Sequence, residues 1–412
     1  MKKILIACFI LVNAPVIAQT KADYDATMDK FKSYYNQHQY DSIYTLLSEH
    51  SQTVMPLDKT TQTFSAVNGQ LGAIRSCEFS KEKDGFDLYK TEFASTTMTI
   101  SLQLDKNNKI NTFRFLPYIQ DSTKSNFNLK TSTGTIYGTL TMPKAESKVP
   151  VVLIIAGSGP TDRNGNNNMG LATNAYLMLA DSLRKSGIAC LRYDKRGVGE
   201  SAGALKDEHS FVFDDIITDA EGFIKMLKED NRFSKIIVLG HSEGSLIGMV
   251  AANKENTNGF ISLAGGGENI GSIIEKQKKA ESEDAAAETK IIVDSLKKGY
   301  DVKNVSPEMQ SLFRPSVQPY MKSWLRYDPA IEIKKLKIPI LILQGTTDMQ
   351  VGVEQAEMLK KANARATMTL IKGMNHVLKH APEDRQQNAA TYAEPDLALS
   401  PGLMQAILKF ID

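Results

Sequence analysis

Residues Lys235–Gly244 read Lys-Ile-Ile-Val-Leu-Gly-His-Ser-Glu-Gly. The apolar run Ile236–Leu239 is typical of a strand that is buried on both faces. It is followed by Gly240-x-Ser242-x-Gly244 and then by small and helix-favouring residues. Strand, sharp turn and helix form the context in which such a sequence presents a nucleophilic serine, and the glycines allow the strained turn. The segment therefore predicts that Ser242 stands at the top of a sheet, beside the N-terminus of a helix.

On both sides of this segment, short apolar runs alternate with amphipathic ones. The predicted strands are Phe127–Thr131, Thr135–Met142, Val149–Ala156, Ile188–Tyr193, Lys235–Leu239, Gly259–Leu263, Ile338–Leu343 and Thr367–Ile371. The predicted helices are Ala175–Lys185, Phe213–Lys228, Glu243–Asn253, Glu354–Lys361 and Gly402–Phe410. Such alternation predicts an α/β fold, with a mostly parallel central sheet and helices on both faces. Ligands of such sheets bind at the carboxyl ends of the strands.

Two of these strand ends carry the partners that a reactive serine needs. A serine hydroxyl is a poor nucleophile until a base takes its proton, and the base needs an orienting acid. One strand ends in Gln-Gly-Thr-Thr-Asp348, and the last ends in Lys-Gly-Met-Asn-His376. The chain order Ser242, Asp348, His376 is the order expected for a serine on this kind of turn. The sequence predicts these three as nucleophile, acid and base.

Other residues compete for these roles. His380, one helical turn further on, is a second candidate base, and Asp328 and Glu354 are weaker candidates for the acid. His241 directly precedes the nucleophile, so its side chain is expected to point away from Ser242 and to serve as a packing residue.

The loop after the first long strand is rich in glycine and is predicted to help stabilise an oxyanion. One donor is expected to be the backbone N–H of Glu243, and the second the N–H of Ser158, within the loop Gly157–Asn166. A phosphate-binding loop is the competing reading, but no Gly-Lys-Ser/Thr follows. Asp162 and Arg163 are expected either to shape the substrate pocket or to form an ion pair that fixes the loop.

Taken together, five segments resemble the α/β-hydrolases. They are Gly157–Gly165 (Gly-Ser-Gly-Pro-Thr-Asp-Arg-Asn-Gly), Tyr193–Ser201 (Tyr-Asp-Lys-Arg-Gly-Val-Gly-Glu-Ser), Gly-His-Ser-Glu-Gly, Gln-Gly-Thr-Thr-Asp and Gly-Met-Asn-His. The likeness covers roughly residues 125–412. The first loop and a long insertion resemble secreted carboxylesterases of the EstD type and, more distantly, the serine aminopeptidases.

The resemblance implies a Ser242–His376–Asp348 triad, a small-molecule ester substrate and no cofactor. It also implies that the Asp-x-Arg-Gly-x-Gly-x-Ser segment is structural. Ala156-Gly157 stands where many relatives have His-Gly, which leaves the details of the pocket open.

The beginning of the chain is typical of a secretory signal peptide, residues 1–18. Lys2 and Lys3 precede a short apolar run, and cleavage is expected after Ala18. A membrane span is disfavoured because Asn13 and Pro15 interrupt the apolar run, and a lipid-modified Cys8 is a further alternative. We therefore expect a secreted or periplasmic protein without stable membrane insertion.

Residues 19–117 are predicted to form a separate α+β domain. Aromatic and aliphatic residues recur at helical spacing from Tyr24 to Tyr35, from Tyr40 to Leu47 and across Leu57–Ile74, and alternating strands follow up to residue 115. This order resembles small cystatin-like domains. The domain is expected to be a packing or interaction module, with substrate recruitment or homodimerisation as the alternative.

Residues 118–126 are predicted to be a linker and residues 127–412 the catalytic domain. Within the latter, residues 267–332 separate two strands by a segment too long for a bare loop. Its charged run Ile274–Lys298 and aromatic-rich run Leu312–Tyr327 predict a helical lid, and a surface excursion without substrate contact is the alternative.

Composition excludes several classes of function. The chain has 49 basic and 47 acidic residues, and removal of residues 1–18 would leave 47 of each, so the charge favours no nucleic-acid partner. No set of Cys and His has the spacing of metal ligands, and Cys77 and Cys190 fall in different predicted domains. The predicted function is hydrolysis of short-chain carboxylic esters. A serine peptidase or aminopeptidase with the same triad, and an inactive binding protein with the same fold, are the alternatives.

Overall fold

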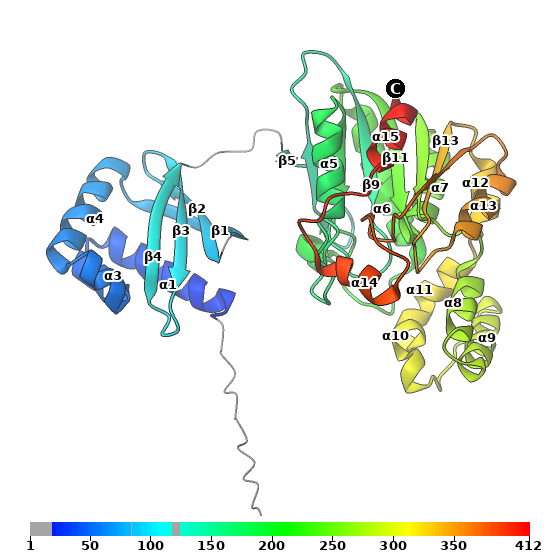
Figure 1. The fold of residues 1–412 in the computed structure, drawn as a ribbon, viewed down its shortest axis with the longest axis horizontal. Coiled ribbons are helices and arrows are strands. Elements are labelled where there is room, and N and C mark those ends of the chain that lie inside the picture. Colours follow the sequence, from blue (N-terminus) through cyan, green and yellow to red (C-terminus); the bar gives the residue numbers. More distant parts are fainter. Residues whose placement is uncertain (1–18, 84, 118–123) are drawn as a thin grey trace, which may run out of the picture. The chain divides into compact units, whose positions relative to one another are not determined.

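The computed structural model describes residues 19–83, 85–117 and 124–412. The chain divides into two compact units between residues 121 and 122, and each unit has its own core (Figure 1). The predicted signal peptide and residues 118–123 of the predicted linker lie outside the described residues. Lys124–Asn126 are also not linker but strand β5, because they pair with a neighbouring strand of the second unit.

The first unit consists of helices followed by an antiparallel sheet, as predicted. The helices are α1 (Lys21–Asn36), α2 (Tyr40–Leu46), α3 (Glu49–Val54) and α4 (Leu57–Leu71). The strands are β1 (Ile74–Lys83), β2 (Phe86–Phe93), β3 (Thr97–Leu104) and β4 (Ile110–Pro117), paired in that order. Buried aromatic side chains of α1 and α4, including Phe31 and Phe64, pack with Phe113 of β4.

The structure corrects one boundary in this unit. Ile74 was expected to end the third helix, but it begins β1. Gly72 ends α4 with a φ of 75°, and a Cβ at this position would lie 2.6 Å from Cβ of Ala94, so only glycine fits the turn. Helix α3 and strand β1 were not predicted.

The second unit is the predicted α/β fold. Its strands are β5, β8 (Gly138–Thr141), β9 (Val149–Ile155), β10 (Ala189–Tyr193), β11 (Phe233–His241), β12 (Gly259–Leu263), β13 (Ile340–Gly345) and β14 (Thr367–Ile371). Within the described residues the sheet order is β14-β13-β12-β11-β9-β10-β8-β5, and all pairs are parallel except those made by β8. A separate hairpin joins β6 (Leu129–Lys130) to β7 (Thr135–Ile136).

Helices cover both faces of this sheet (Figure 1). Apolar residues of α6 (Phe213–Glu229), α7 (Glu243–Glu255), α12 (Pro329–Lys335) and α13 (Val353–Ala362) pack on one face. Those of α5 (Ala175–Lys185) and α15 (Leu403–Ile411) pack on the other. Outside the insertion, the unit also contains α14 (Arg385–Ala390) and the short 3₁₀ helices η1 (Gly199–Ala204) and η4 (Thr391–Ala393).

The insertion between β12 and β13 forms a small helical subdomain with its own apolar cluster. It contains α8 (Ile270–Lys279), α9 (Glu283–Lys297), η2 (Pro307–Met309), α10 (Gln310–Phe313), η3 (Pro315–Val317) and α11 (Gln318–Leu325). The charged run Ile274–Lys298 contains parts of two helices, because Ser282 caps a new helix by accepting a hydrogen bond from the N–H of Ala285. Figure 1 shows α8 to α11 gathered at one side of the sheet.

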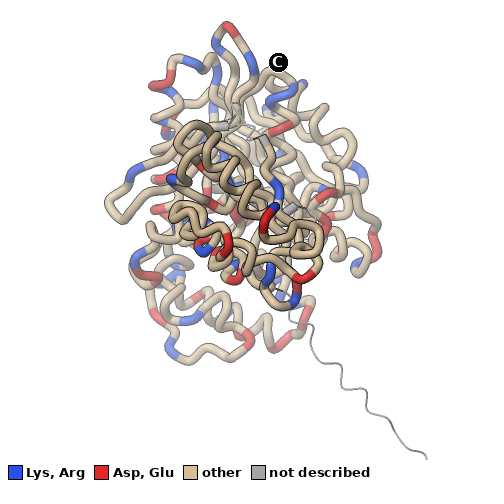
Figure 2. Tube along the Cα trace, turned by 90° about the vertical axis from the view of Figure 1, so that its left-hand side faces the viewer, with Lys and Arg blue, Asp and Glu red and all other residues tan. Residues whose placement is uncertain are grey.

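Acidic and basic residues are interspersed along the described chain (Figure 2). The near-neutral formal charge of +2 therefore reflects mixing of the two signs rather than two opposed regions. None of the described helices combines the length and the apolar character needed to cross a membrane.

Candidate active site

Ser242 stands on the strained turn that the sequence predicts. It lies between β11 and α7 with a φ of 53°, a left-handed conformation that is rare for residues other than glycine. The flanking glycines make the turn possible. A Cβ on Gly240 would lie 2.1 Å from the carbonyl oxygen of Gly244, and one on Gly244 would lie 2.3 Å from that of Ile155. The helix that begins here directs its N-terminal N–H groups and positive dipole end toward the turn.

The sheet brings the predicted acid and base to the same edge as Ser242. Asp348 follows β13 and His376 follows β14, and β11 to β14 are neighbouring parallel strands. Nδ1 of His376 lies 2.8 Å from Oδ2 of Asp348. His380, the competing base, is exposed. Asp328, a competing acid, instead caps α12 by accepting from the N–H of Ala330.

The carboxylate of Asp348 is held by several donors. Its Oδ1 accepts hydrogen bonds from the N–H groups of Gln350 and Val351, at 2.8 and 2.9 Å, and its side chain is 0 % exposed. Burial alone would raise the pKa of Asp348, but the positive charge and hydrogen bond of His376, with those two N–H groups, lower it overall. Asp348 therefore stays ionised at neutral pH and orients the ring of His376.

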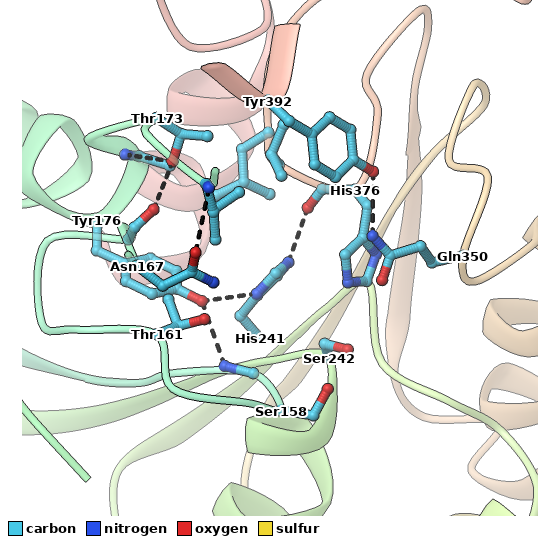
Figure 3. A pocket seen from close by; sticks show the side chains of 16 residues that line it. Ser158, Thr161, Asn167, Thr173, Tyr176, His241, Ser242, Gln350, His376 and Tyr392 are labelled. Carbon is cyan, nitrogen blue, oxygen red and sulfur yellow. Dashed lines mark hydrogen bonds between the residues drawn. The ribbon is translucent and has the colours of Figure 1, made fainter. Parts of the chain in front are cut away.

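Ser242 and His376 line the same cavity, which has a volume of about 250 Å³. Its lining also includes Gly157, Ser158, Asn167, Tyr176, His241, Gln350 and Tyr392. In Figure 3, Ser242 lies between His376 and Ser158. Among the described residues, Ser242 and His376 share no hydrogen bond, which is common for a nucleophile and its base before substrate binds.

His241 points away from Ser242, as expected for a packing residue. Its Nδ1 lies 2.8 Å from the hydroxyl of Tyr176, and its Nε2 lies 2.9 Å from the carbonyl oxygen of His376 (Figure 3). Burial lowers the pKa of His241 to about 3, so the ring is neutral at physiological pH. A neutral ring that donates from Nε2 supports the backbone of the residue that carries the base.

Two backbone N–H groups are available for an oxyanion where the sequence predicts them. Ser158 and Ser242 line the same cavity, and Glu243 is the first residue of α7. In the described part of the chain, neither the N–H of Ser158 nor that of Glu243 donates to a protein acceptor. A backbone N–H without a protein acceptor is the kind of donor that stabilises negative charge on a substrate oxygen, so both groups stay candidates for that role.

The structure places Asp162 and Arg163 differently from the pocket prediction. Asp162 accepts hydrogen bonds from the N–H groups of Asn164 and Asn166, at 2.8 and 3.0 Å, and so closes the loop on itself. Arg163 forms an ion pair with Asp194, at 2.8 Å, rather than with Asp162. Neither residue is part of the lining around Ser242. Both fix the loop, because their side chains are engaged by groups outside the cavity.

Sequence reasoning missed a buried cluster around Glu243. Nζ of Lys195 lies 2.8 Å from Oε2 of Glu243 and 2.5 Å from the carbonyl oxygen of Gly157. The hydroxyl of Tyr320, on α11, lies 2.7 Å from Oε1 of the same carboxylate. Lys195 belongs to a segment that the family resemblance assigns to structure alone, and Tyr320 is 77 positions from Glu243, so no local pattern joins the three residues.

Residues of the insertion line a second cavity, of about 210 Å³, that also reaches Ser242. Its apolar lining comprises Leu246, Ile270, Ile273, Ile274, Leu312, Met321, Trp324, Pro329 and Val351. Helices α8 and α11 of the insertion therefore form part of the wall beside Ser242, and a lid role for the insertion stays a prediction.

No group of three or more His, Cys, Asp or Glu side chains suited to a metal ion occurs among the described residues.

The sheet order, the strained serine turn and the Asp–His pair at the strand ends give the second unit the α/β-hydrolase fold. Residues 169–281 match the family described as serine aminopeptidase, S33. Residues 29–113, in the first unit, match a family of proteins of unknown function, DUF3887.

One curated relative is esterase EstD of Thermotoga maritima, which is 30% identical over 251 residues, or 58% of this chain. The chain spans 57% of the length of that relative.

Solved structures with a similar fold include esterases and a peptidase. Est1E from Butyrivibrio proteoclasticus, with ferulic acid bound, has 20% identity and a TM-score of 0.45 over 65% of this chain and 96% of its own. The acylaminoacyl peptidase of Pyrococcus horikoshii has 14% identity and a TM-score of 0.43 over 74% of this chain and 45% of its own. Likeness at this level says nothing about the substrate.

Proposed function

We propose that the protein hydrolyses short-chain carboxylic esters through an acyl-enzyme on Ser242. The observation that carries the proposal is the 2.8 Å contact between Asp348 and His376, on the edge of the sheet where Ser242 lines the same cavity as His376. The similarity to an esterase at 30% identity supports an ester as the substrate class.

The reaction follows from the roles of the residues. His376 takes the proton of the Ser242 hydroxyl while the oxygen of Ser242 attacks the ester carbonyl. The negative charge moves to the carbonyl oxygen, near the N–H groups of Ser158 and Glu243. When the tetrahedral intermediate collapses, the bond to the alcohol oxygen breaks and His376 returns the proton to that oxygen. His376 then takes a proton from water as its oxygen attacks the acyl carbon; the bond from that carbon to Oγ of Ser242 breaks, His376 returns the proton to Oγ, and the acid is released.

The second cavity supports a small apolar group on the substrate. Aliphatic residues and one tryptophan make up much of its wall, and a further cavity, of about 540 Å³, shares Leu312, Met321 and Trp324 with it. We propose that the insertion acts as a lid, because its helices cover this cavity.

A peptidase is the second candidate, because the family that matches residues 169–281 is described as serine aminopeptidase. An aminopeptidase needs a carboxylate near the substrate amine. Glu243, the acid next to the nucleophile, is occupied by Lys195 and Tyr320. Glu268 lines the second cavity, and its Oε1 accepts from Lys276 and Gln355 at 2.6 and 2.7 Å. These contacts favour esters over amino-acyl amides.

The decisive experiment compares ester and amide turnover by the full chain and by Ser242→Ala. We expect hydrolysis of p-nitrophenyl acetate and butyrate to exceed that of amino-acyl p-nitroanilides, and Ser242→Ala to lower kcat by roughly 10⁴-fold or more. Ser245→Ala is the matched control, because Ser245 lies on the same helix and its hydroxyl bonds to Ser262 at 2.7 Å. A fluorophosphonate should label Ser242. Ester turnover that survives in Ser242→Ala would refute the mechanism, and a protein that neither turns over esters nor reacts with the probe would be a binding protein.

We also propose that residues 1–18 are removed on export to the periplasm or the medium. Mass spectrometry of the exported protein should find Gln19 at its N-terminus, and an intact Met1 would contradict the proposal.

A further inference from the structure

The ammonium group of Lys195 lies between the two segments that supply the proposed oxyanion donors. Lys195 follows β10, and its Nζ bonds to the carbonyl oxygen of Gly157 and to the carboxylate of Glu243. The side chains of Lys195 and Glu243 are 7 % and 3 % exposed. A charged pair so well shielded from water interacts far more strongly than one on the surface.

The contact with Gly157 constrains Ser158. The carbonyl group of Gly157 and the N–H of Ser158 belong to one planar trans peptide, so they point in opposite directions. Fixing the carbonyl oxygen on Nζ of Lys195 therefore also fixes the direction of the Ser158 N–H. A hydrogen bond from a cation further polarises the peptide, which makes its N–H a stronger donor.

The contact with Glu243 constrains the other donor. Glu243 supplies a backbone N–H directly after Ser242, and its side chain is held by Lys195 and, through Oε1, by Tyr320. Both donor residues are thus tied to the same ammonium group, although Gly157 follows β9 and Glu243 begins α7.

We propose that Lys195 is a positioning residue of the oxyanion hole: one buried ammonium group sets the geometry of the Ser158 N–H and anchors Glu243. The inference rests on the proposed function, because it assigns Lys195 a part in stabilising the tetrahedral intermediate. Because Lys195→Met leaves the buried carboxylate of Glu243 without its cation, it also costs stability, so kcat per folded molecule rather than stability reports the positioning role.

The test compares Lys195→Met with Arg196→Met. Methionine has nearly the length of lysine without its charge. Arg196 is the adjacent buried cation, and its partner is Asp219, at 2.6 Å. We expect Lys195→Met to lower kcat for p-nitrophenyl butyrate by roughly 10- to 100-fold, less than the 10²- to 10³-fold typical of a lost oxyanion donor, with KM changed less than about threefold. Arg196→Met should lower the thermal unfolding midpoint without a comparable loss of kcat per folded molecule.

A second measurement separates positioning from folding. A trifluoromethyl ketone forms a tetrahedral adduct with the serine, so its affinity should fall by the same factor as kcat/KM in Lys195→Met. The affinity for the product butyrate, which is not tetrahedral, should stay close to that of the parent protein. Lys195→Arg keeps the charge but not the position of Nζ, so we expect an intermediate loss of kcat. If Lys195→Met does not fold, the kcat of Lys195→Arg is the quantity that tests the proposal.

The outcomes distinguish the two proposals. If Ser242→Ala abolishes turnover but Lys195→Met keeps the kcat and ketone affinity of the parent, the inference about Lys195 is wrong and the proposed function stands. The inference about Lys195 is also wrong if Lys195→Met loses activity only in proportion to the fraction of molecules that are unfolded. If the parent protein shows no serine-dependent ester hydrolysis, both proposals fail together.

Discussion

The hydroxyl of Tyr320 lies 2.7 Å from the carboxylate of Glu243, so a helix of the insertion is hydrogen-bonded to the residue that follows the proposed nucleophile. The ring of Tyr320 also stacks on Phe211, with 5.1 Å between centroids, and contacts Trp324 edge-on. Among the described residues, the insertion is therefore joined to the turn that carries Ser242 by a polar contact within an aromatic cluster.

Replacing Tyr320 by phenylalanine should loosen this contact and keep the aromatic packing. The carboxylate loses one donor, at a cost of about 1–3 kcal/mol to the docked insertion. Hydrogen exchange should show faster exchange of the amides of α11, with little change in the strands of the sheet. Tyr300→Phe is the control, because Tyr300 lies in the same insertion and is 68% exposed. Equal exchange in both variants would show that the contact does not hold the insertion.

Asp348→Asn should lower kcat for ester hydrolysis by roughly 10³- to 10⁴-fold with little change in fold. Asparagine keeps the shape but not the charge that holds His376 in the working orientation and stabilises its protonated form. The matched control is Asp328→Asn, since asparagine also caps helices well and Asp328 caps α12. Steady-state kinetics with p-nitrophenyl butyrate provide the measurement. A larger loss of kcat in Asp328→Asn than in Asp348→Asn would show that Asp328, and not Asp348, is the acid.

His241 should make the protein less stable as the pH falls. Burial lowers its pKa in the folded protein to about 3, whereas an unperturbed histidine titrates near 6.5. Between these values the unfolded chain binds a proton that the folded protein does not, so this contribution is lost as the pH falls from about 6.5 towards 3. In His241→Gln the free energy of unfolding should depend less steeply on pH in this window. Parallel curves for the two proteins, from urea unfolding at each pH, would contradict this assignment.

Ile273 should control the length of the acyl chain that is accepted. Its side chain lines the apolar cavity beside Ser242, on α8. We expect Ile273→Phe to lower kcat/KM for p-nitrophenyl hexanoate more than for the acetate, and Ile273→Ala to shift the ratio the opposite way, each by about three- to tenfold, as for one or two methylene groups. Ratios that shift in the same direction in both variants would place the acyl chain elsewhere.

Gly240→Ala should destabilise the protein by about 3 kcal/mol or more, because the added Cβ meets backbone 2.1 Å away and the neighbouring chain cannot yield. Gly203→Ala is the control, since a Cβ there has no neighbour within 4 Å. Thermal unfolding distinguishes the two variants. Equal midpoints would mean that the turn relaxes at little cost.

The sequence was informative wherever a local pattern sets the structure. The two strands Gly259–Leu263 and Thr367–Ile371 and the helix Ala175–Lys185 have the predicted bounds, because apolar runs and helical periodicity are properties of neighbouring residues. The chain order of Ser242, Asp348 and His376 was likewise enough to predict three residues that the fold brings to one edge of the sheet, although their catalytic roles stay a prediction.

Contacts between distant segments were not predictable in this way. Arg163 pairs with Asp194, and Lys195 contacts both Gly157 and Glu243. These partners are far apart in the sequence, so the periodicity of neighbouring residues does not predict the contacts. The pair Asp162–Arg163 invited a pocket assignment because both are polar and follow a strand end. The side chain of Asp162 instead accepts from N–H groups of its own loop, and that of Arg163 turns to Asp194 in another loop. The division of Ile274–Lys298 into two helices depends on the single capping residue Ser282, which does not stand out within a run of charged residues.

Strand β5 has a consequence for shortened forms of the protein. Among the described residues it forms one edge of the sheet, with β14 at the other, and it covers the hydrogen-bonding groups along one side of β8. A chain that starts at Phe127 would leave that side of β8 open to pair with another molecule, whereas one that starts at Ser122 would keep it covered. These few residues, which look dispensable in the sequence, should therefore decide whether the isolated second unit stays monodisperse or aggregates.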